Sequence, residues 1–306
     1  MESFELSLPN GGVVSGLYNF PPQPTTTKSA LPLIVCVPGG SYDAHYFDAN
    51  PEHSILAVSQ KVDIPVISIN RPCYGASTPA PPSTSGLTYA QAQGEYLDKV
   101  VFPALWKEFA TKSGATHMVL IGHSIGAMMI TIVAGVHEES SNYPLAGLIT
   151  SGIGTELAEG PRGVMIHLLN ETSDLVHFDI AAKDAIMFQW PHQALIDENM
   201  CRYTERLNQP VPAGELHDIN MNWLNYWRQY SEKVKVPLMY GLSEFDGLWT
   251  SGQHIVDDYR AAFSASPLVN SQIIPHAPHC IELSLQSKAW YLKCCGFALE
   301  CVRQPR

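Results

Sequence analysis

The chain has 306 residues, of which 45% are hydrophobic and 15% charged, and its mean hydropathy is -0.02. Such values are typical of a globular protein, and the length allows one large domain with a full core and an insertion. The formal net charge of -11 and the lack of clustered Lys and Arg argue against nucleic-acid binding, because phosphate contacts require such clusters.

Targeting features and cysteines constrain the compartment. The N-terminal sequence MESFELSLPNGG lacks a positively charged lead into an apolar run, so no secretory signal is predicted, and no apolar segment is long enough to span a bilayer. The seven cysteines are scattered without C-x-x-C spacing, which favours free thiols over disulfides or a zinc site. We therefore expect a cytoplasmic protein, and the sequence leaves its oligomeric state open.

The first half of the chain alternates predicted strands and helices. Two short β-type runs, Phe4–Leu8 and Val13–Tyr18, flank Asn10-Gly11-Gly12, a pattern typical of a hairpin. Continuous apolar runs predict buried strands at 33–37, 64–69 and 145–150. Helices are expected at 52–61 and, bent by Pro103, at 88–111. This alternation favours an α/β fold with a parallel sheet covered on both faces.

The second half begins with a change of pattern. From about residue 152 to 233 no buried strand is evident, and large apolar side chains recur in sequence of helical character. We interpret this segment as a helical cap inserted into the fold. Strands are predicted again at 236–240 and 271–274, and helices at 253–263 and 286–301. The expected organisation is a core domain of residues 1–151 and 234–306 with a cap at 152–233.

A serine lies at the sharpest predicted turn of the chain. The segment His117–Ile132 runs an apolar strand into Gly122-His123-Ser124-Ile125-Gly126 and then into a Met-rich helix. Strand, turn and helix around G-x-S-x-G are the context of a nucleophile elbow, in which strain exposes the serine hydroxyl. The alternative is an ordinary serine helix cap. We predict Ser124 as a nucleophile and assign no proton-transfer role to His123.

Acid and base candidates follow later predicted strands. Asp246, in the loop after strand 236–240, is the predicted acid, with Glu244 as a lesser candidate, although both suit a solvated turn. His279, after strand 271–274, is the predicted base, although a loop histidine is usually a polar surface residue. The chain order of serine, acid and histidine matches one fold that uses a nucleophile elbow.

The predicted chemistry also requires donors for a developing oxyanion. Pro38-Gly39-Gly40 ends the first central strand, and the backbone N–H groups of Gly40 and Ile125 are the candidates, although a plain tight turn would explain the glycines. Asp43, His45 and Asp48 are better explained as a polar loop than as metal ligands, so no metal or cofactor is expected.

A set of mostly apolar side chains is predicted to form the substrate pocket. The alternative is that the aromatic residues of the cap form its core, since a helical lid must bury one face. The candidates are Tyr42, Met165, Met187, Trp190, Trp223 and Trp227.

Together these motifs resemble the α/β-hydrolase superfamily from end to end. The resemblance rests on GHSIG, PGG, NRPCYGAS, GLSEFD and HAPHCIEL, and it implies an eight-stranded, mostly parallel sheet, a cap between the sixth and seventh strands, and Ser124, Asp246 and His279 as triad. Two positions depart from the family pattern: Pro38 stands where many members have His, and Asn70 replaces a frequent Asp.

We therefore expect a serine hydrolase that cleaves an ester, thioester or lactone of a bulky apolar small molecule, such as a specialised metabolite, through an acyl-enzyme. C–C bond hydrolysis or acyl transfer at the same site remains an alternative, because a fold does not determine its reaction. A ligand-binding protein that keeps the fold without turnover is the alternative of another class.

Overall fold

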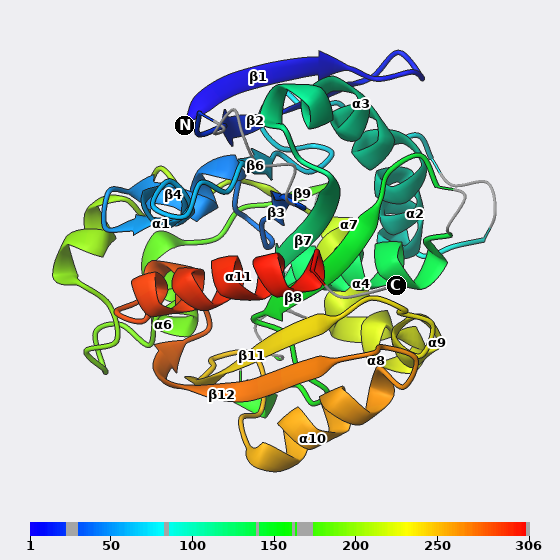
Figure 1. Cartoon of the computed structure of the whole chain (residues 1–306). Helices are drawn as coiled ribbons and strands as arrows, with labels where there is room; N and C mark the ends of the chain where they lie inside the picture. The colour runs from blue at the N-terminus through cyan, green and yellow to red at the C-terminus, as the bar shows by residue number, and fades with distance from the viewer. Residues whose placement is uncertain (23–29, 83–85, 139–140, 161–162, 164–173, 304–306) are drawn as a thin grey trace.

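The computed structural model describes residues 1–22, 30–82, 86–138, 141–160, 163 and 174–303 (Figure 1). One sheet dominates these residues, with strands in the order β1-β2-β6-β3-β7-β8-β11-β12. Their bounds are β1 Glu2–Ser7, β2 Val13–Asn19, β3 Pro32–Val37, β6 Val66–Ile69, β7 His117–His123, β8 Leu145–Ser151, β11 Leu238–Phe245 and β12 Val269–Pro278. β2 pairs antiparallel with β1 and β6, and the pairs from β6 to β12 are parallel. The predicted eight-stranded, mostly parallel sheet is confirmed.

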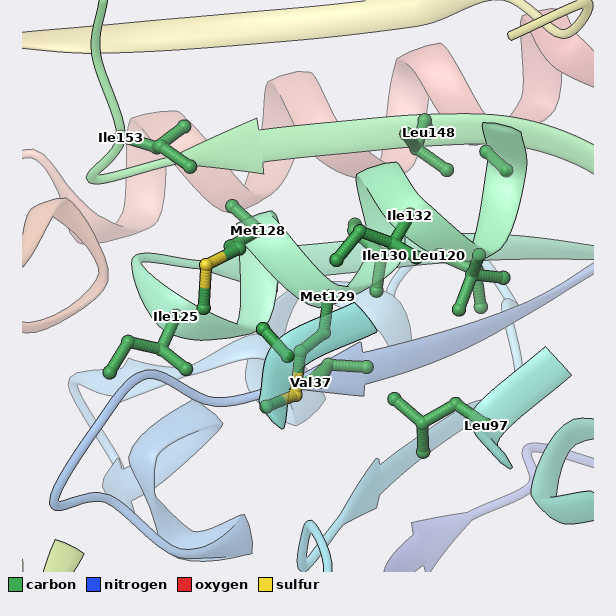
Figure 2. Packing of buried hydrophobic residues seen from close by; sticks show 14 of the residues in the cluster. Val37, Leu97, Leu120, Ile125, Met128, Met129, Ile130, Ile132, Leu148 and Ile153 are labelled. Carbon is green, nitrogen blue, oxygen red and sulfur yellow. The ribbon is translucent and has the colours of Figure 1, made fainter. Parts of the chain in front are cut away.

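The central strands are mostly apolar, as a sheet covered on both faces requires. In β3, Leu33, Val35 and Val37 enter one hydrophobic cluster, whereas Ile34 and Cys36 enter the other. Helix α4 (Ile125–Val136) contributes to the first cluster, and Figure 2 shows its side chains packed with Val37 and Leu120. Helix α11 (Ser287–Cys301) contributes to the second and crosses the viewer's side of the sheet in Figure 1.

The predicted helix at 88–111 is a composite of three segments. Helix α2 (Tyr89–Tyr96) starts with a capping box between Thr88 and Gln91, a π-helical turn follows at Leu97–Val101, and α3 continues over Phe102–Ser113. Pro103 has no N–H and its ring would collide with the carbonyl four residues earlier in a regular helix, so the wider turn just before it relieves that conflict.

The predicted helix at 52–61 is shorter than expected. Helix α1 covers only Ile55–Ser59, because β5 (His53–Ser54) pairs with β4 (Asp48–Asn50). The Ser54 hydroxyl accepts the N–H of Ala57 and so defines the start of the helix. The remaining elements of the core are a 3-10 turn at Ala44–Phe47, α10 at Gln253–Ala262 and a 3-10 turn at Ile281–Leu283.

The segment 152–233 joins the sixth and seventh strands of the sheet. Its described part consists of short helical pieces and a ribbon of two-residue strands. Their bounds are β9 Leu175–Val176, α6 Ile180–Met187, a 3-10 turn Glu198–Arg202, β10 Val211–Pro212, α7 Ala213–His217, a π turn Asp218–Asn222, α8 Trp223–Tyr226 and α9 Arg228–Ser231. In the described ranges, none of the helices combines the length and apolar character needed to cross a membrane.

Parallel pairing brings the candidate segments to one edge of the sheet. Strands β3, β7, β11 and β12 all point the same way, and the segments that leave their carboxyl ends begin at residues 38, 124, 246 and 279. Groups distant in sequence meet at such an edge, which is where open α/β sheets build their sites.

Candidate active site

Ser124 occupies a strained turn between β7 and α4. Its backbone has φ 53° and ψ -120°, a conformation unusual for any residue but glycine. A Cβ on Gly126 would lie 2.0 Å from the carbonyl oxygen of Val37, and one on Gly122 would lie 2.7 Å from that of Gly126. Both flanking glycines are therefore required by close backbone approach, as the elbow motif predicts.

The loop after β3 lies directly against this turn. A Cβ on Gly39 would approach the Ser124 Cβ to 3.0 Å, and one on Gly40 would approach Cδ1 of Ile125 to 2.6 Å. Among the described residues, the N–H groups of Gly40 and Ile125 have no protein acceptor. Two unpaired backbone donors thus lie next to the serine, where an anion would be stabilised by them and by the start of α4.

His279 and Asp246 are in direct contact. Nδ1 of His279 lies 2.9 Å from Oδ1 and 3.0 Å from Oδ2 of Asp246. Oδ1 also accepts the N–H groups of Leu248 and Trp249, at 2.9 and 3.1 Å, so the carboxylate is oriented from two sides. Nε2 of His279 is buried and has no hydrogen-bond partner in the part of the chain described. The His279 ring packs 4.9 Å from that of His123, the neighbour of Ser124.

Glu244 faces elsewhere. Its Oε2 accepts the backbone N–H of His276 at 2.8 Å, at an exposed position. The two carboxylates that the sequence leaves as alternatives therefore have different partners, and only Asp246 contacts His279.

A second buried polar cluster lies beneath these residues. His123 is fully buried and stacks on the Tyr46 ring at 4.7 Å, and burial followed by the proximity of His279 lowers its pKa well below the ordinary value. Glu282 accepts from Ser151 Oγ at 2.6 Å, Trp290 Nε1 at 2.9 Å and Tyr46 at 2.8 Å, while burial raises its pKa. Sequence reasoning missed Glu282, although a carboxylate in the apolar run CIEL signals a buried, bonded group.

A pocket opens in front of Ser124. It contains about 560 Å³ of space, part of which is open to solvent. The lining residues are mostly apolar: Gly40, Ser124, Ile125, Leu157, Ala158, Phe178, Met187, Leu216, Ile219, Asn220, Leu248 and Trp249. Met187 is the one predicted pocket residue in this lining, and Met165 lies outside the described residues. Trp249 was missed, although its place three residues after Asp246 puts it on the acid loop.

The other predicted pocket residues that the structure describes are not part of this lining: Tyr42, Trp223 and Trp227 are buried, and Trp190 is half-buried. Trp223 and Trp227 are 1% and 2% exposed, and Trp227 stacks on Tyr259 at 5.5 Å between rings. Tyr42 packs on Tyr46, and Trp190 packs against the second hydrophobic cluster. Their size and apolar character suit a core as well as a pocket, so composition alone could not distinguish the two.

The polar loop after the first central strand is held by local bonds. Oδ1 of Asp43 accepts the N–H of His45 at 2.9 Å and caps the 3-10 turn there, while Asp48 contacts Ser54 and the N-terminal amine. No cluster of three or more His, Cys, Asp or Glu suited to a metal occurs within the described ranges.

Fold and site together define a hydrolase-type α/β protein. A sequence model of the alpha/beta hydrolase family matches residues 34–289, and the chain belongs to that family. No curated protein sequence matches the chain.

Several solved structures share the fold. A protein from Burkholderia cenocepacia assigned as an aryl esterase is 12% identical with a TM-score of 0.68, covering 99% of this chain and 100% of that one. An N-acyl homoserine lactonase is 13% identical with a TM-score of 0.65, covering 100% and 98%. A monoglyceride lipase from Saccharomyces cerevisiae is 13% identical with a TM-score of 0.67, covering 99% and 97%. At such identities the similarity concerns the fold.

Proposed function

We propose that the protein is a serine hydrolase in which Ser124 is the nucleophile, His279 the general base and Asp246 the residue that orients the imidazole. The observation that carries this proposal is the contact of 2.9 Å between His279 Nδ1 and Asp246, and the His279 ring packs 4.9 Å from that of His123, the residue before a serine held at φ 53°. Because a carboxylate with two backbone donors can only accept from Nδ1, the neutral imidazole keeps its lone pair on Nε2.

The proposed reaction proceeds through an acyl-enzyme. Ser124 Oγ attacks the carbonyl carbon while Nε2 of His279 takes the hydroxyl proton, and the resulting oxyanion accepts the N–H groups of Gly40 and Ile125. Collapse expels the alcohol or thiol, which leaves with the proton from His279. Water then repeats the sequence and releases the acid. Preorganised donors of this kind contribute about 10²- to 10³-fold each to kcat.

The lining of the pocket supports a substrate with a bulky apolar group. Leu157, Phe178, Leu216 and Ile219 come from the segment 152–233, and Leu248 and Trp249 come from the acid loop. We infer that 152–233 is a cap that supplies this pocket, and that the substrate is an ester, thioester or lactone of a specialised metabolite. The esterase, lactonase and lipase that share the fold are consistent with this range of bonds.

We also infer a reducing, cytoplasmic setting. All seven cysteines are free, and five of them are buried. A chain matured in an oxidising compartment more often pairs its cysteines.

An activity-based probe tests the proposal. An alkyl fluorophosphonate should label wild-type protein at Ser124, identified by peptide mass spectrometry, and should not label Ser124→Ala. Hydrolysis of a series of p-nitrophenyl esters, followed by lactones and acyl thioesters, should fall to background in the same variant. Folded wild-type protein that is neither labelled nor active would instead support a ligand-binding protein. Transfer of the acyl group to an added alcohol in preference to water would favour an acyltransferase.

A further inference from the structure

A buried ion pair links the loop that carries Gly40 to the segment 152–233. Arg71 follows β6 and Glu215 lies in α7, 144 residues later, and each residue is 1% exposed. Nη1 of Arg71 donates to Oε1 of Glu215. Burial of two charges costs free energy that their attraction does not reliably recover, so such a pair is a weak source of stability. A role in holding geometry is the better explanation.

The same two residues and Tyr74 bind the backbone on both sides of Gly40. Arg71 donates from Nε to the carbonyl oxygen of Pro38 at 2.8 Å and from Nη2 to that of Gly39 at 2.9 Å. The Tyr74 hydroxyl donates to Oε2 of Glu215 at 2.9 Å and accepts the N–H of Ser41 at 3.1 Å. The peptide groups before and after Gly40 are therefore both fixed by one network.

This anchoring determines where the Gly40 N–H points. The peptide between Gly39 and Gly40 is trans, so its C=O and N–H point in opposite directions. With the Gly39 oxygen directed at the Arg71 guanidinium, the Gly40 N–H points to the other side of the loop. Gly40 lines the pocket with Ser124, and Gly39 packs on the serine Cβ position.

The turn around Gly40 is closed by a local bond from the Tyr42 N–H to the Gly39 oxygen at 3.3 Å, and other segments also hold Ser41, the residue after Gly40. Ser41 has φ 60°, which a side chain rarely adopts without compensating contacts. Its carbonyl oxygen accepts from Lys183 Nζ at 3.2 Å and from the Gln209 N–H at 3.0 Å, both in the segment 152–233. Contacts from this segment therefore hold the loop in place on two sides.

We propose that Arg71, Tyr74 and Glu215 are positioning residues that preorganise the Gly40 N–H for the oxyanion, and that Glu215 makes this donor depend on the placement of α7. Leu216, the neighbour of Glu215 in α7, lines the pocket. A substrate that packs on Leu216 therefore also stabilises the position of α7 in which Glu215 holds Arg71 and Tyr74. This inference rests on the proposed function. Acylation and deacylation both pass through an oxyanion, so loss of this positioning lowers kcat without weakening substrate binding.

Two substitutions and one matched control test the inference. Tyr74→Phe releases the Ser41 N–H and one Glu215 oxygen but keeps the ion pair, whereas Glu215→Gln removes the charge that holds Arg71. Tyr143→Phe is the control, because Tyr143 is buried and donates to Asp98 at 2.6 Å, outside the pocket lining. Each variant is assayed with the p-nitrophenyl ester that wild-type protein hydrolyses fastest and with a trifluoromethyl ketone, whose adduct with Ser124 is an oxyanion.

The expected result is a selective loss in the two test variants. In each, kcat should fall about 10- to 100-fold with KM within about twofold, and the trifluoromethyl ketone should bind weaker by a similar factor. Tyr143→Phe should leave kcat, KM and the binding of the trifluoromethyl ketone unchanged. Should Glu215→Gln fail to fold, as circular dichroism would show, Tyr74→Phe decides the matter. Folded test variants with wild-type kcat, or with only a raised KM, would overturn the positioning role and leave the proposed function intact. A wild-type protein that shows neither turnover nor probe labelling would overturn both.

Discussion

Nδ1 of His279 and Oδ1 of Asp246 lie 2.9 Å apart, although the two residues are 33 positions apart in the sequence. Two backbone N–H groups also donate to this carboxylate, which fixes its orientation relative to the imidazole. Glu244, two residues earlier, contacts the backbone of His276 instead. This difference separates two acidic residues that the sequence alone presents as alternatives.

Asp246→Asn should therefore lower kcat about 10³- to 10⁴-fold. The amide keeps the shape of the side chain but not its charge, and its NH₂, in the place of Oδ2, donates to Nδ1. The proton of the neutral imidazole then lies on Nε2, which can no longer take a proton from Ser124. Steady-state hydrolysis of a p-nitrophenyl ester measures the loss. Glu244→Gln is the matched control and should retain activity within about threefold. Equal losses in the two variants would contradict the assignment of Asp246.

Gly126→Ala should destabilise the protein by several kcal/mol or prevent folding. The added Cβ would lie 2.0 Å from the carbonyl oxygen of Val37 and 2.5 Å from that of Pro38, and backbone atoms of a central strand cannot move aside cheaply. Gly296→Ala, in the middle of α11 with open space around it, should instead stabilise by about 0.5–1 kcal/mol. Urea unfolding measures both, and similar effects of the two substitutions would contradict the packing of the elbow.

Ile219→Trp should limit hydrolysis to esters with short chains. Ile219 lines the pocket and is 8% exposed, so the indole would fill space that an acyl or alcohol chain needs. We expect kcat/KM for long-chain p-nitrophenyl esters to fall about tenfold or more while acetate hydrolysis changes little, in the range of steric effects of 1–3 kcal/mol. Leu292→Trp, at a position 54% exposed on α11, is the control. An unchanged chain-length profile would remove Ile219 from the substrate pocket.

Lys183→Met should change how stability depends on pH. Burial lowers the pKa of Lys183 from 10.5 to about 7. Between about pH 7 and 10.5 the unfolded chain binds a proton that the folded protein does not, so stability rises with pH in this window, by an amount on the order of 1 kcal/mol per pH unit. Below pH 7 the lysine is protonated in both states and adds no slope.

Urea unfolding of wild type and Lys183→Met at pH 7 and pH 9 measures this difference. The free energy of unfolding of the wild type should increase relative to that of the variant between the two values. Groups other than Lys183 titrate in both proteins and cancel in the comparison. Parallel pH dependences would show that Lys183 keeps its proton, held by the oxygens of Ser41, Leu207 and Asn208.

Much of the fold could be predicted from the sequence because its determinants are local. The apolar run at 33–37 predicts a strand covered on both faces, and Gly122 and Gly126 predict a turn that only glycine can flank. The positions of Ser124, Asp246 and His279 after the parallel strands β7, β11 and β12 follow from that pattern, since all such strands end at one edge of the sheet. Their catalytic roles remain predictions.

Tertiary structure decided which side chains meet at that edge. Trp223 and Trp227 are as apolar as the pocket-lining Trp249, and only packing distinguishes the first two as core residues. Arg71 and Glu215 are 144 residues apart, and neither shows in its local sequence that it would bind the other or the carbonyl groups beside Gly40. Backbone sterics act over a few residues and can be read from short motifs, whereas the pairing of buried polar groups depends on how separate loops pack together.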